Sequence, residues 1–143
     1  MEDSNLLQRE ITRLDVIFVG STYYLKSNQT IKDISDLELH SIALIKGLNG
    51  QAINKNVLKN VTPRFSSNSM PVLKDFVSLG KGIATLPKFL CRKELAMNEF
   101  QQVLVNDIYI SRGLFLLSRH TSYIPNHVKV FKDFIFQKLK NEL

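Results

Sequence analysis

The sequence is poor in cysteine and holds no long apolar run. Of its 143 residues only Cys91 is a cysteine, which excludes an internal disulfide and a zinc site built from several thiolates. No apolar stretch approaches the roughly 20 residues that a membrane-spanning helix needs. The opening segment MEDSNLLQRE lacks the basic start and apolar core of a secretory signal. We therefore expect a cytoplasmic protein that makes no membrane contact.

The histidines and the single thiol do not form a site of known spacing. His40, His120 and His127 have neither the close spacing nor the acidic neighbours of a metal motif. Cys91 could act as a nucleophile only if a histidine approached it, and it is better explained as a small apolar residue packed on a helix. We expect no metal site, and structural or surface roles for these side chains.

Glycine and carboxylate patterns give no catalytic motif either. The segment Gly80-Lys81-Gly82 lacks the Walker spacing and ends a helical pattern instead of starting one, so it predicts a turn. Asp33 with Asp36, and Glu99 with Asp107, show none of the convergence that acid–base chemistry needs, and we expect them to be solvated. The sequence thus predicts a protein that is not an enzyme and needs no cofactor.

The composition is that of one ordinary globular domain with a moderate positive charge. Hydrophobic residues make up 44% and charged residues 22% of the chain, and the formal net charge is +6. Lysine and arginine are spread along the chain, without the dense basic run or the interleaved aromatics of a nucleic-acid surface. The charge would serve solubility, or it would attract an anionic ligand to a cleft.

The stretch 62–87 carries the clearest structural pattern. We predict a strand over 63–67, a helix whose apolar residues recur at helical spacing, and a second strand over 83–86. Gly80 and Gly82 would end the helix, because glycine accepts left-handed backbone. The unit is strand–helix–strand, so its two strands should be parallel.

Strands and helices alternate over the remainder of the chain, which predicts an α/β fold with a mainly parallel sheet. The last helix should bury one apolar stripe against the core. Residues 46–60 have the least pattern and predict a loop or a hairpin. The other predicted strands cover 6–13, 14–19, 41–45, 101–105 and 113–118; the other predicted helices follow Thr22, Ile31, Pro87 and Pro125; and the stripe of the last helix is Val128, Phe131, Phe134, Ile135 and Leu139.

Two polar junctions each follow a predicted strand and precede a predicted helix. They are Val19-Gly20-Ser21-Thr22 and Ser66-Ser67-Asn68-Ser69. Backbone N–H groups at helix starts bind anions, and hydroxyl side chains add donors. Capping of the two helices would explain the same residues without a ligand. A shared ligand cleft and simple capping both stay open at this point.

An ordered set of motifs over nearly the whole chain resembles a known family. The set begins with VIFVGSTYYL at Val16–Leu25, Asp36-Leu37 and His40. It continues with Phe65–Asn68, then Gly80, Gly82, Ile83, Leu86 and Pro87, then Phe100–Leu104, Leu114–Ser118 and Val128–Leu139. In this order the motifs resemble the C-terminal part of the effector-binding domain of LysR-type transcriptional regulators.

The resemblance implies a fold like that of type II periplasmic binding proteins, with two α/β lobes and a ligand cleft between them. Residues up to about 118 would supply the second lobe nearly whole, and residues from about 119 to 143 would return to the first. The helix-turn-helix of the family is absent from this sequence, so DNA would be bound only through a missing N-terminal domain.

The resemblance also implies a sensory function. The domain would bind a small, anionic effector and modulate transcription; the alternative is a solute-binding protein of a transport system with the same fold. Candidate residues of the cleft wall are Gly20, Ser21, Ser67, Asn68 and Thr85, with Ser21 and Ser67 donating hydroxyls. We also expect a homo-oligomer, in the first place a dimer, formed through Phe131, Phe134 and Ile135 of the last helix.

Overall fold

The structure, a computed structural model, describes residues 6–46, 61–108, 110–119 and 123–143. It divides into two compact units. Unit 1 is Met1–Leu14 with Arg112–Leu143, and unit 2 is Asp15–Ser111. These limits differ from the predicted lobe segments, about 1–118 and about 119–143, because the first strand of the chain contributes to both units. The assignment of lobes stays a prediction.

Unit 2 is built on a mixed sheet with the strand order β3-β2-β4-β1-β5. Both β3 and β4 pair with β2 in parallel, which confirms the predicted parallel strand–helix–strand unit. The strand β1 runs antiparallel to both of its neighbours, β4 and β5, so the prediction of a mainly parallel sheet is wrong on that side. The strands of the described residues are β1 (Leu6–Ser21), β2 (Ile42–Ile45), β3 (Phe65–Ser67), β4 (Ile83–Pro87), β5 (Phe100–Val103) and β6 (Ile110–Arg119).

The helices begin close to where the sequence predicts them, with three local differences. The helix predicted at Ile31 is a 3-10 turn that begins only at Ile34. Ser21, not Thr22, caps the first helix, since its Oγ accepts a hydrogen bond from the Tyr24 amide at 3.1 Å. The single helix predicted after Pro87 is a 3-10 turn followed by a short α-helix. The helices are α1 (Thr22–Ser27), α2 (Met70–Ser78), α3 (Arg92–Ala96) and α4 (Asn126–Glu142), with 3-10 turns η1 (Ile34–Leu39) and η2 (Lys88–Cys91).

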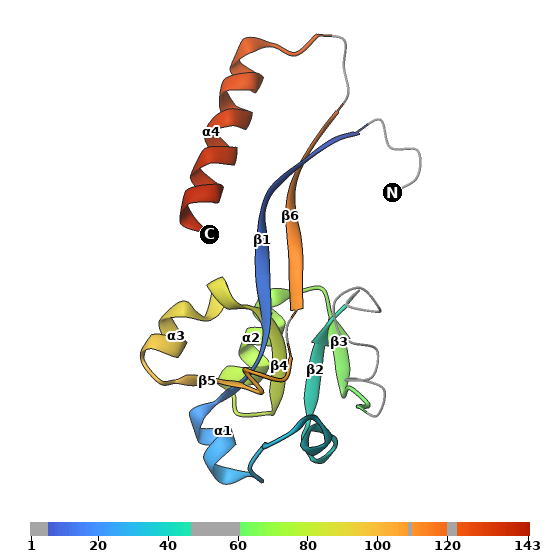
Figure 1. The fold of residues 1–143 in the computed structure, drawn as a ribbon, viewed down its shortest axis with the longest axis vertical. Helices are drawn as coiled ribbons and strands as arrows, with labels where there is room; N and C mark the ends of the chain where they lie inside the picture. Colours follow the sequence, from blue (N-terminus) through green and yellow to red (C-terminus); the bar gives the residue numbers. More distant parts are fainter. Residues whose placement is uncertain (1–5, 47–60, 109, 120–122) are drawn as a thin grey trace. The chain divides into compact units, whose positions relative to one another are not determined.

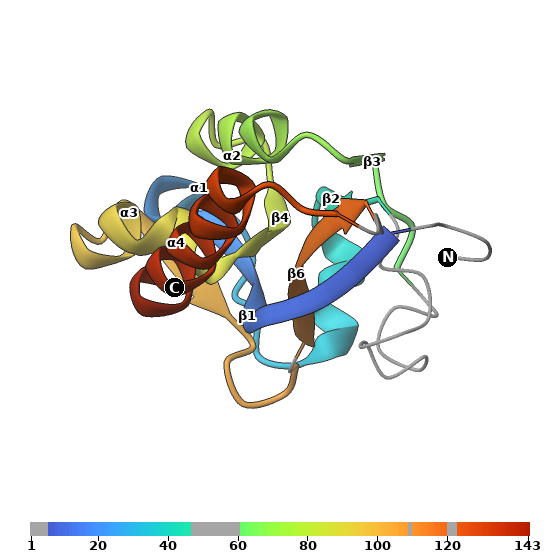
Figure 2. The same cartoon turned by 90° about the horizontal axis from the view of Figure 1, so that it is seen from above.

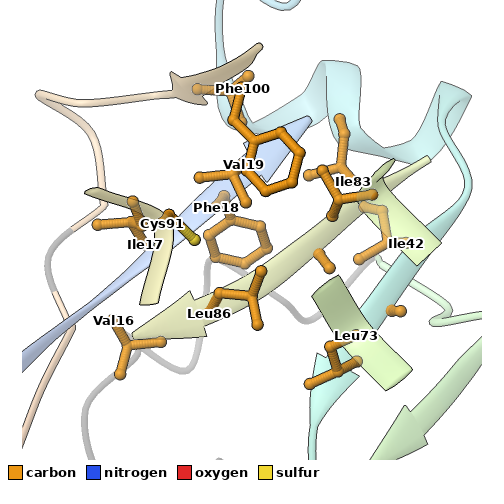
Figure 3. Close-up of a cluster of buried hydrophobic side chains, with 14 of the residues drawn as sticks. Val16, Ile17, Phe18, Val19, Ile42, Leu73, Ile83, Leu86, Cys91 and Phe100 are labelled. Carbon is orange, nitrogen blue, oxygen red and sulfur yellow. The ribbon is translucent and has the colours of Figure 1, made fainter. Parts of the chain in front are cut away.

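The core of unit 2 lies around β4 and the second half of β1. Figure 3 shows Phe18 and Leu86 among the surrounding apolar side chains, all of them buried. The first four residues of β4, Ile83 to Leu86, are buried, as expected for a central strand covered on both faces. Because α2 contributes Leu73 and Val77 to this core, its N-terminus is held in a fixed place against the sheet.

Two glycines after α2 have the predicted left-handed backbone. Gly80 has φ +67° and Gly82 has φ +155°. A Cβ at Gly82 would lie 2.2 Å from the backbone oxygen of Ser41, which itself accepts a hydrogen bond from the Ile83 amide. Only glycine allows β4 to start this close to β2.

Unit 1 contains the first half of β1, nearly all of β6, and α4. The two strands pair, and they lie side by side in both views of the chain (Figures 1 and 2). The predicted buried stripe of α4 is wrong at Phe131 and Phe134, which are 63% and 58% exposed, whereas Ile135 and Leu139 are half-buried. The buried aromatic ring is that of Phe136, which stacks beneath the guanidinium of Arg9. The packed side of α4 is therefore rotated away from the predicted stripe.

None of the helices in the described part of the chain combines the length and the apolarity needed to cross a membrane.

Candidate functional site

The five predicted site residues all lie in unit 2, but the strand register separates them. Gly20 pairs with Ile83, the first residue of β4. Ser67 pairs with Ile45, the last residue of β2, and β2 runs parallel to β4. Gly20 and Ser21 thus lie where β2 and β4 begin, which we call the Ser21 end. Ser67 and Asn68 lie where β2, β3 and β4 finish, which we call the Ser67 end.

The expectation that the two polar junctions share one ligand is therefore not supported by the topology. β4 extends about 13 Å between the two ends, at roughly 3.3 Å per residue. The cause is the direction of β1: it runs against its neighbours, so the junction after it lies opposite the junction after β3.

At the Ser21 end the predicted residues have structural roles. Ser21 is buried and caps α1. A Cβ at Gly20 would lie 3.2 Å from the side chain of Leu25, so the absence of a side chain at Gly20 lets Leu25 pack closely on β1. Capping, one of the two explanations of this junction, accounts for Ser21, and packing against Leu25 accounts for Gly20.

A polar pair at the Ser21 end was not predicted. The Tyr24 hydroxyl and His40 Nδ1 are 2.8 Å apart, with the two rings edge to face at 5.6 Å. Burial raises the pKa of the Tyr24 hydroxyl. The sequence offers only the weak signal that each residue lies beside a strand, and their 16-residue separation matches no local motif. His40, one of the motif residues that carry the family resemblance, thus packs against an aromatic side chain.

Thr85 holds the two central strands together. It is fully buried, and its Oγ1 accepts a hydrogen bond from the Ile45 amide at 2.8 Å. This bond fixes the last residue of β2 against β4. Thr85 therefore helps to position the strands at the Ser67 end. Its side chain is fully buried and cannot contact a ligand.

The Ser67 end is built from the junction between β3 and α2. Ser67 Oγ accepts a hydrogen bond from the Ser69 amide at 3.0 Å, and the Ser67 backbone oxygen accepts one from the Lys46 amide at 2.8 Å. Asn68 follows with its side chain exposed. The junction is thus held to the end of β2 by backbone bonds, while the side-chain amide of Asn68 faces solvent.

The start of α2 favours negative charge at the Ser67 end. The first turn holds no acidic residue, and the Ser69 side chain makes no capping hydrogen bond. Pro71 has no N–H, and the amides of Met70 and Val72 have no acceptor within the helix. These donors carry the positive end of the helix dipole, so an anion would be stabilised there.

Lys46 adds a positive charge at this end and was missed from sequence. It directly follows β2, its side chain is exposed, and its amide bonds to Ser67. It belongs to the poorly patterned stretch 46–60, of which residues 47–60 lie outside the described residues. Its role would have followed from the sequence only if the parallel pairing of β2 with β3 had been known.

The side chains considered for catalysis or metal binding have other surroundings. Cys91 is buried, and burial raises its pKa to about 11, so the thiol is protonated at neutral pH and a poor nucleophile. The Asp36 carboxylate accepts hydrogen bonds from the Lys32 and Asp33 amides, which lower its pKa. Within the described ranges no three His, Cys, Asp or Glu residues come together as metal ligands would. His127 is exposed, and His120 lies outside the described residues.

Comparison with known proteins gives the same family at the levels of sequence and fold. The family model of the LysR substrate binding domain matches residues 2–140. An uncharacterised HTH-type transcriptional regulator of Haemophilus influenzae is 33% identical over 110 residues, which cover 73% of this chain and 38% of that protein. The chain therefore spans well under two thirds of the length of this relative.

Solved structures agree on the fold. The regulatory domain of CrgA, a LysR-type transcriptional regulator from Neisseria meningitidis, superposes with a TM-score of 0.82 at 21% identity, covering 97% of this chain and 72% of that one. Full-length AphB, the Vibrio cholerae virulence activator, gives a TM-score of 0.77 at 25% identity, covering 96% and 49%. The predicted α/β fold of the type II periplasmic-binding-protein kind is confirmed, and the transport-type alternative is not favoured. The chain belongs to the LysR substrate-binding domain family.

Proposed function

We propose that this chain is the ligand-sensing part of a LysR-type transcriptional regulator. The observation that carries the proposal is the family match over residues 2–140. The Haemophilus influenzae relative is described as an HTH-type regulator, and the chain aligns with 38% of it. DNA would be contacted by a helix-turn-helix elsewhere in the full regulator, which would act in the cytoplasm.

We further propose that a small anionic effector binds at the Ser67 end of unit 2. The amides of Met70 and Val72, the Ser67 hydroxyl and the exposed Asn68 amide would supply donors, and Lys46 would supply positive charge. Thr85 would position β2, whereas Gly20 and Ser21 would shape α1. This proposal keeps Ser67 and Asn68 as contact residues and gives the other three predicted residues supporting roles.

Effector binding at the Ser67 end could affect unit 1 through the chain segment that links the two units. β1 enters unit 2 at Asp15, and the neighbouring Val16 pairs with Pro87, the last residue of β4. The effector would therefore bind at the same end of the sheet as the covalent link to unit 1. A change in transcription requires only that the effector bind one arrangement of the protein better than another.

Thermal stability in the presence of candidate effectors tests this assignment. A panel of small carboxylates and phosphates is added to the chain, and compounds that raise the melting temperature are retested on Ser67→Ala and Ser66→Ala. Ser66 is exposed and projects from the opposite face of β3, which makes it the matched control. We expect Ser67→Ala to weaken binding about fivefold or more and Ser66→Ala to leave it unchanged. Equal loss in both variants would refute the site.

Self-association is proposed for the same domain. Phe131 and Phe134 on α4 are more than half exposed, and exposed aromatic side chains of this size favour contact with a partner surface.

A further inference from the structure

A cavity in unit 1 combines positively charged, polar and apolar side chains in one wall. Its volume is about 320 Å³. β1 contributes Arg9, β6 contributes Ser118, and α4 contributes Lys129 and Lys132. Leu7 and Leu116 form the apolar part of the wall. The volume falls at the lower end of the range for small-molecule sites, roughly 300–1,000 Å³.

One cation of the cavity is held in place by its neighbours. The guanidinium of Arg9 is 3.6 Å from the Asp133 carboxylate and 3.5 Å above the centre of the Phe136 ring. Stacking on a buried ring restricts the rotamers of Arg9, so its charge is fixed at the cavity wall. Asp133 also lines the cavity. The side chains of Arg9 and Asp133 are 56% and 75% exposed, so water screens both charges.

A second cation of the cavity, on α4, is hydrogen-bonded to a hydroxyl on β6. Lys132 Nζ donates a hydrogen bond to Ser118 Oγ at 2.8 Å. An ammonium has three N–H donors, so two remain for a ligand, and the Ser118 hydroxyl hydrogen can be donated as well. Three cations face one carboxylate here, which leaves the cavity with a net positive charge.

We propose that this cavity binds the carboxylate of a small organic acid that has an apolar body. The carboxylate would lie between Lys132, Ser118 and Lys129, and the apolar body would lie against Leu7 and Leu116. Charge-assisted hydrogen bonds from ammonium and hydroxyl groups favour a carboxylate, and the two leucines favour an aliphatic or aromatic body over a bare anion. The site belongs to unit 1, whereas the proposed effector site belongs to unit 2, so the two proposals stand independently.

The test is a titration of the 143-residue chain followed through backbone amide chemical shifts, with three probes. Hexanoate carries both the charge and the apolar body, hexanamide lacks the charge, and inorganic phosphate lacks the body. We expect saturable shifts with hexanoate at residues 7–9, 116–118 and 129–133, and much weaker effects with the other two probes. The proposal is overturned if hexanoate shifts do not saturate, if they occur only in unit 2, or if either other probe binds as tightly.

Variants of the same helix separate the cavity from general charge. Lys132→Gln should weaken hexanoate binding about fivefold to tenfold, because one charge-assisted donor is lost. Lys138→Gln removes the same charge from α4 at a residue outside the cavity and should change affinity less than about twofold. Ser118→Ala, measured in the same way, keeps the test valid should Lys132→Gln fail to fold. Equal weakening by the two lysine variants would overturn the proposal.

Discussion

Three hydroxyl side chains in unit 2 accept hydrogen bonds from backbone amides. Thr85 is the clearest case, since a fully buried hydroxyl accepts the amide of the last β2 residue, Ile45. Ser21 and Ser67 do the same for the amides of Tyr24 and Ser69. Each of these bonds fixes a strand end. The bond at Ser67 lies beside the N-terminus of α2, which has no side-chain cap.

Replacing Thr85 by valine should destabilise unit 2 with little change in shape. Valine fills the same volume but leaves the Ile45 amide buried without an acceptor, which costs about 1–3 kcal/mol. Thr85→Ser keeps the acceptor and should cost less than Thr85→Val. Urea unfolding of the two variants measures the difference, and a valine variant as stable as the serine variant would show that the hydrogen bond contributes nothing.

Cys91 should be inert in the folded chain. Its thiol is buried and its pKa is raised to about 11, so at pH 8 we expect reaction with a disulfide reagent to be about a hundredfold slower than in concentrated urea.

The raised pKa of Cys91 also predicts how the free energy of unfolding depends on pH. The folded thiol keeps its proton while the unfolded thiol, with its ordinary pKa of 9.0, loses it, so stability should fall between about pH 9 and pH 11. Cys91→Ala should lack this part of the fall. Identical pH profiles for the two proteins would contradict the raised pKa.

For individual residues, the sequence identified the polar side chains that follow each strand. It did not show which of them lie at the same end of the sheet. Ser67 and Ser21 have the same local pattern, and only the direction of β1 in the sheet separates them. Lys46 was missed because its partner Ser67 is distant along the chain. Pairing between distant strands depends on tertiary contacts that a local pattern does not contain.

Among the elements, an ion pair links the helices α2 and α3. Lys74 Nζ lies 2.6 Å from Glu94 Oε1, and the two side chains are 34% and 16% exposed. The hydrogen bond from Lys74 is the main cause that lowers the pKa of Glu94. A carboxyl with a lowered pKa stabilises the fold above its unfolded pKa, and this contribution is lost as pH falls.

A double-mutant cycle with Lys74→Met and Glu94→Gln should therefore give a coupling that depends on pH. We expect about 1 kcal/mol at pH 7, the upper value for partly exposed pairs, and a value near zero at pH 3, where the carboxyl is protonated. The Arg9–Asp133 pair, longer at 3.6 Å and more exposed, serves as the control and should couple weakly at both pH values. A coupling between Lys74 and Glu94 that persisted at pH 3 would contradict this assignment.

Most elements could be predicted because hydrophobic spacing, capping residues and glycines agree locally. The unit from β3 to β4 was predicted with its parallel strands and its terminating Gly80 and Gly82. The predicted break between residues 13 and 14 was wrong, because β1 continues through Asp15 from one unit to the other. A polar residue within a strand resembles a boundary when the two halves pair with different partners.

For the molecule as a whole, we predict self-association through α4. Phe131 and Phe134 are exposed, whereas Phe136 is buried against Arg9. Sedimentation should show concentration-dependent association that Phe131→Ser with Phe134→Ser weakens at least about tenfold. Val105→Ser, a change of an exposed apolar residue in unit 2, is the control. A strictly monomeric parent chain would refute the prediction.

The family could be predicted from an ordered set of weak motifs, because their order and spacing are far more restrictive than any one of them. The rotation of α4 could not, since its apolar residues lie on more than one face and Phe136 was not part of the predicted stripe. Which face of an amphipathic helix packs depends on the partner, here Arg9 and the β1–β6 pair, that the local pattern does not name.

We propose that this chain senses an anionic effector at the Ser67 end of unit 2. The most direct test of this proposal is effector-dependent transcription from a reporter, measured with the full-length regulator carrying Ser67→Ala or the control Ser66→Ala. We predict that Ser67→Ala shifts the effector concentration for half-maximal response upward by about fivefold or more, while Ser66→Ala matches the parent protein. An unchanged response in Ser67→Ala, with normal protein levels, would contradict the account.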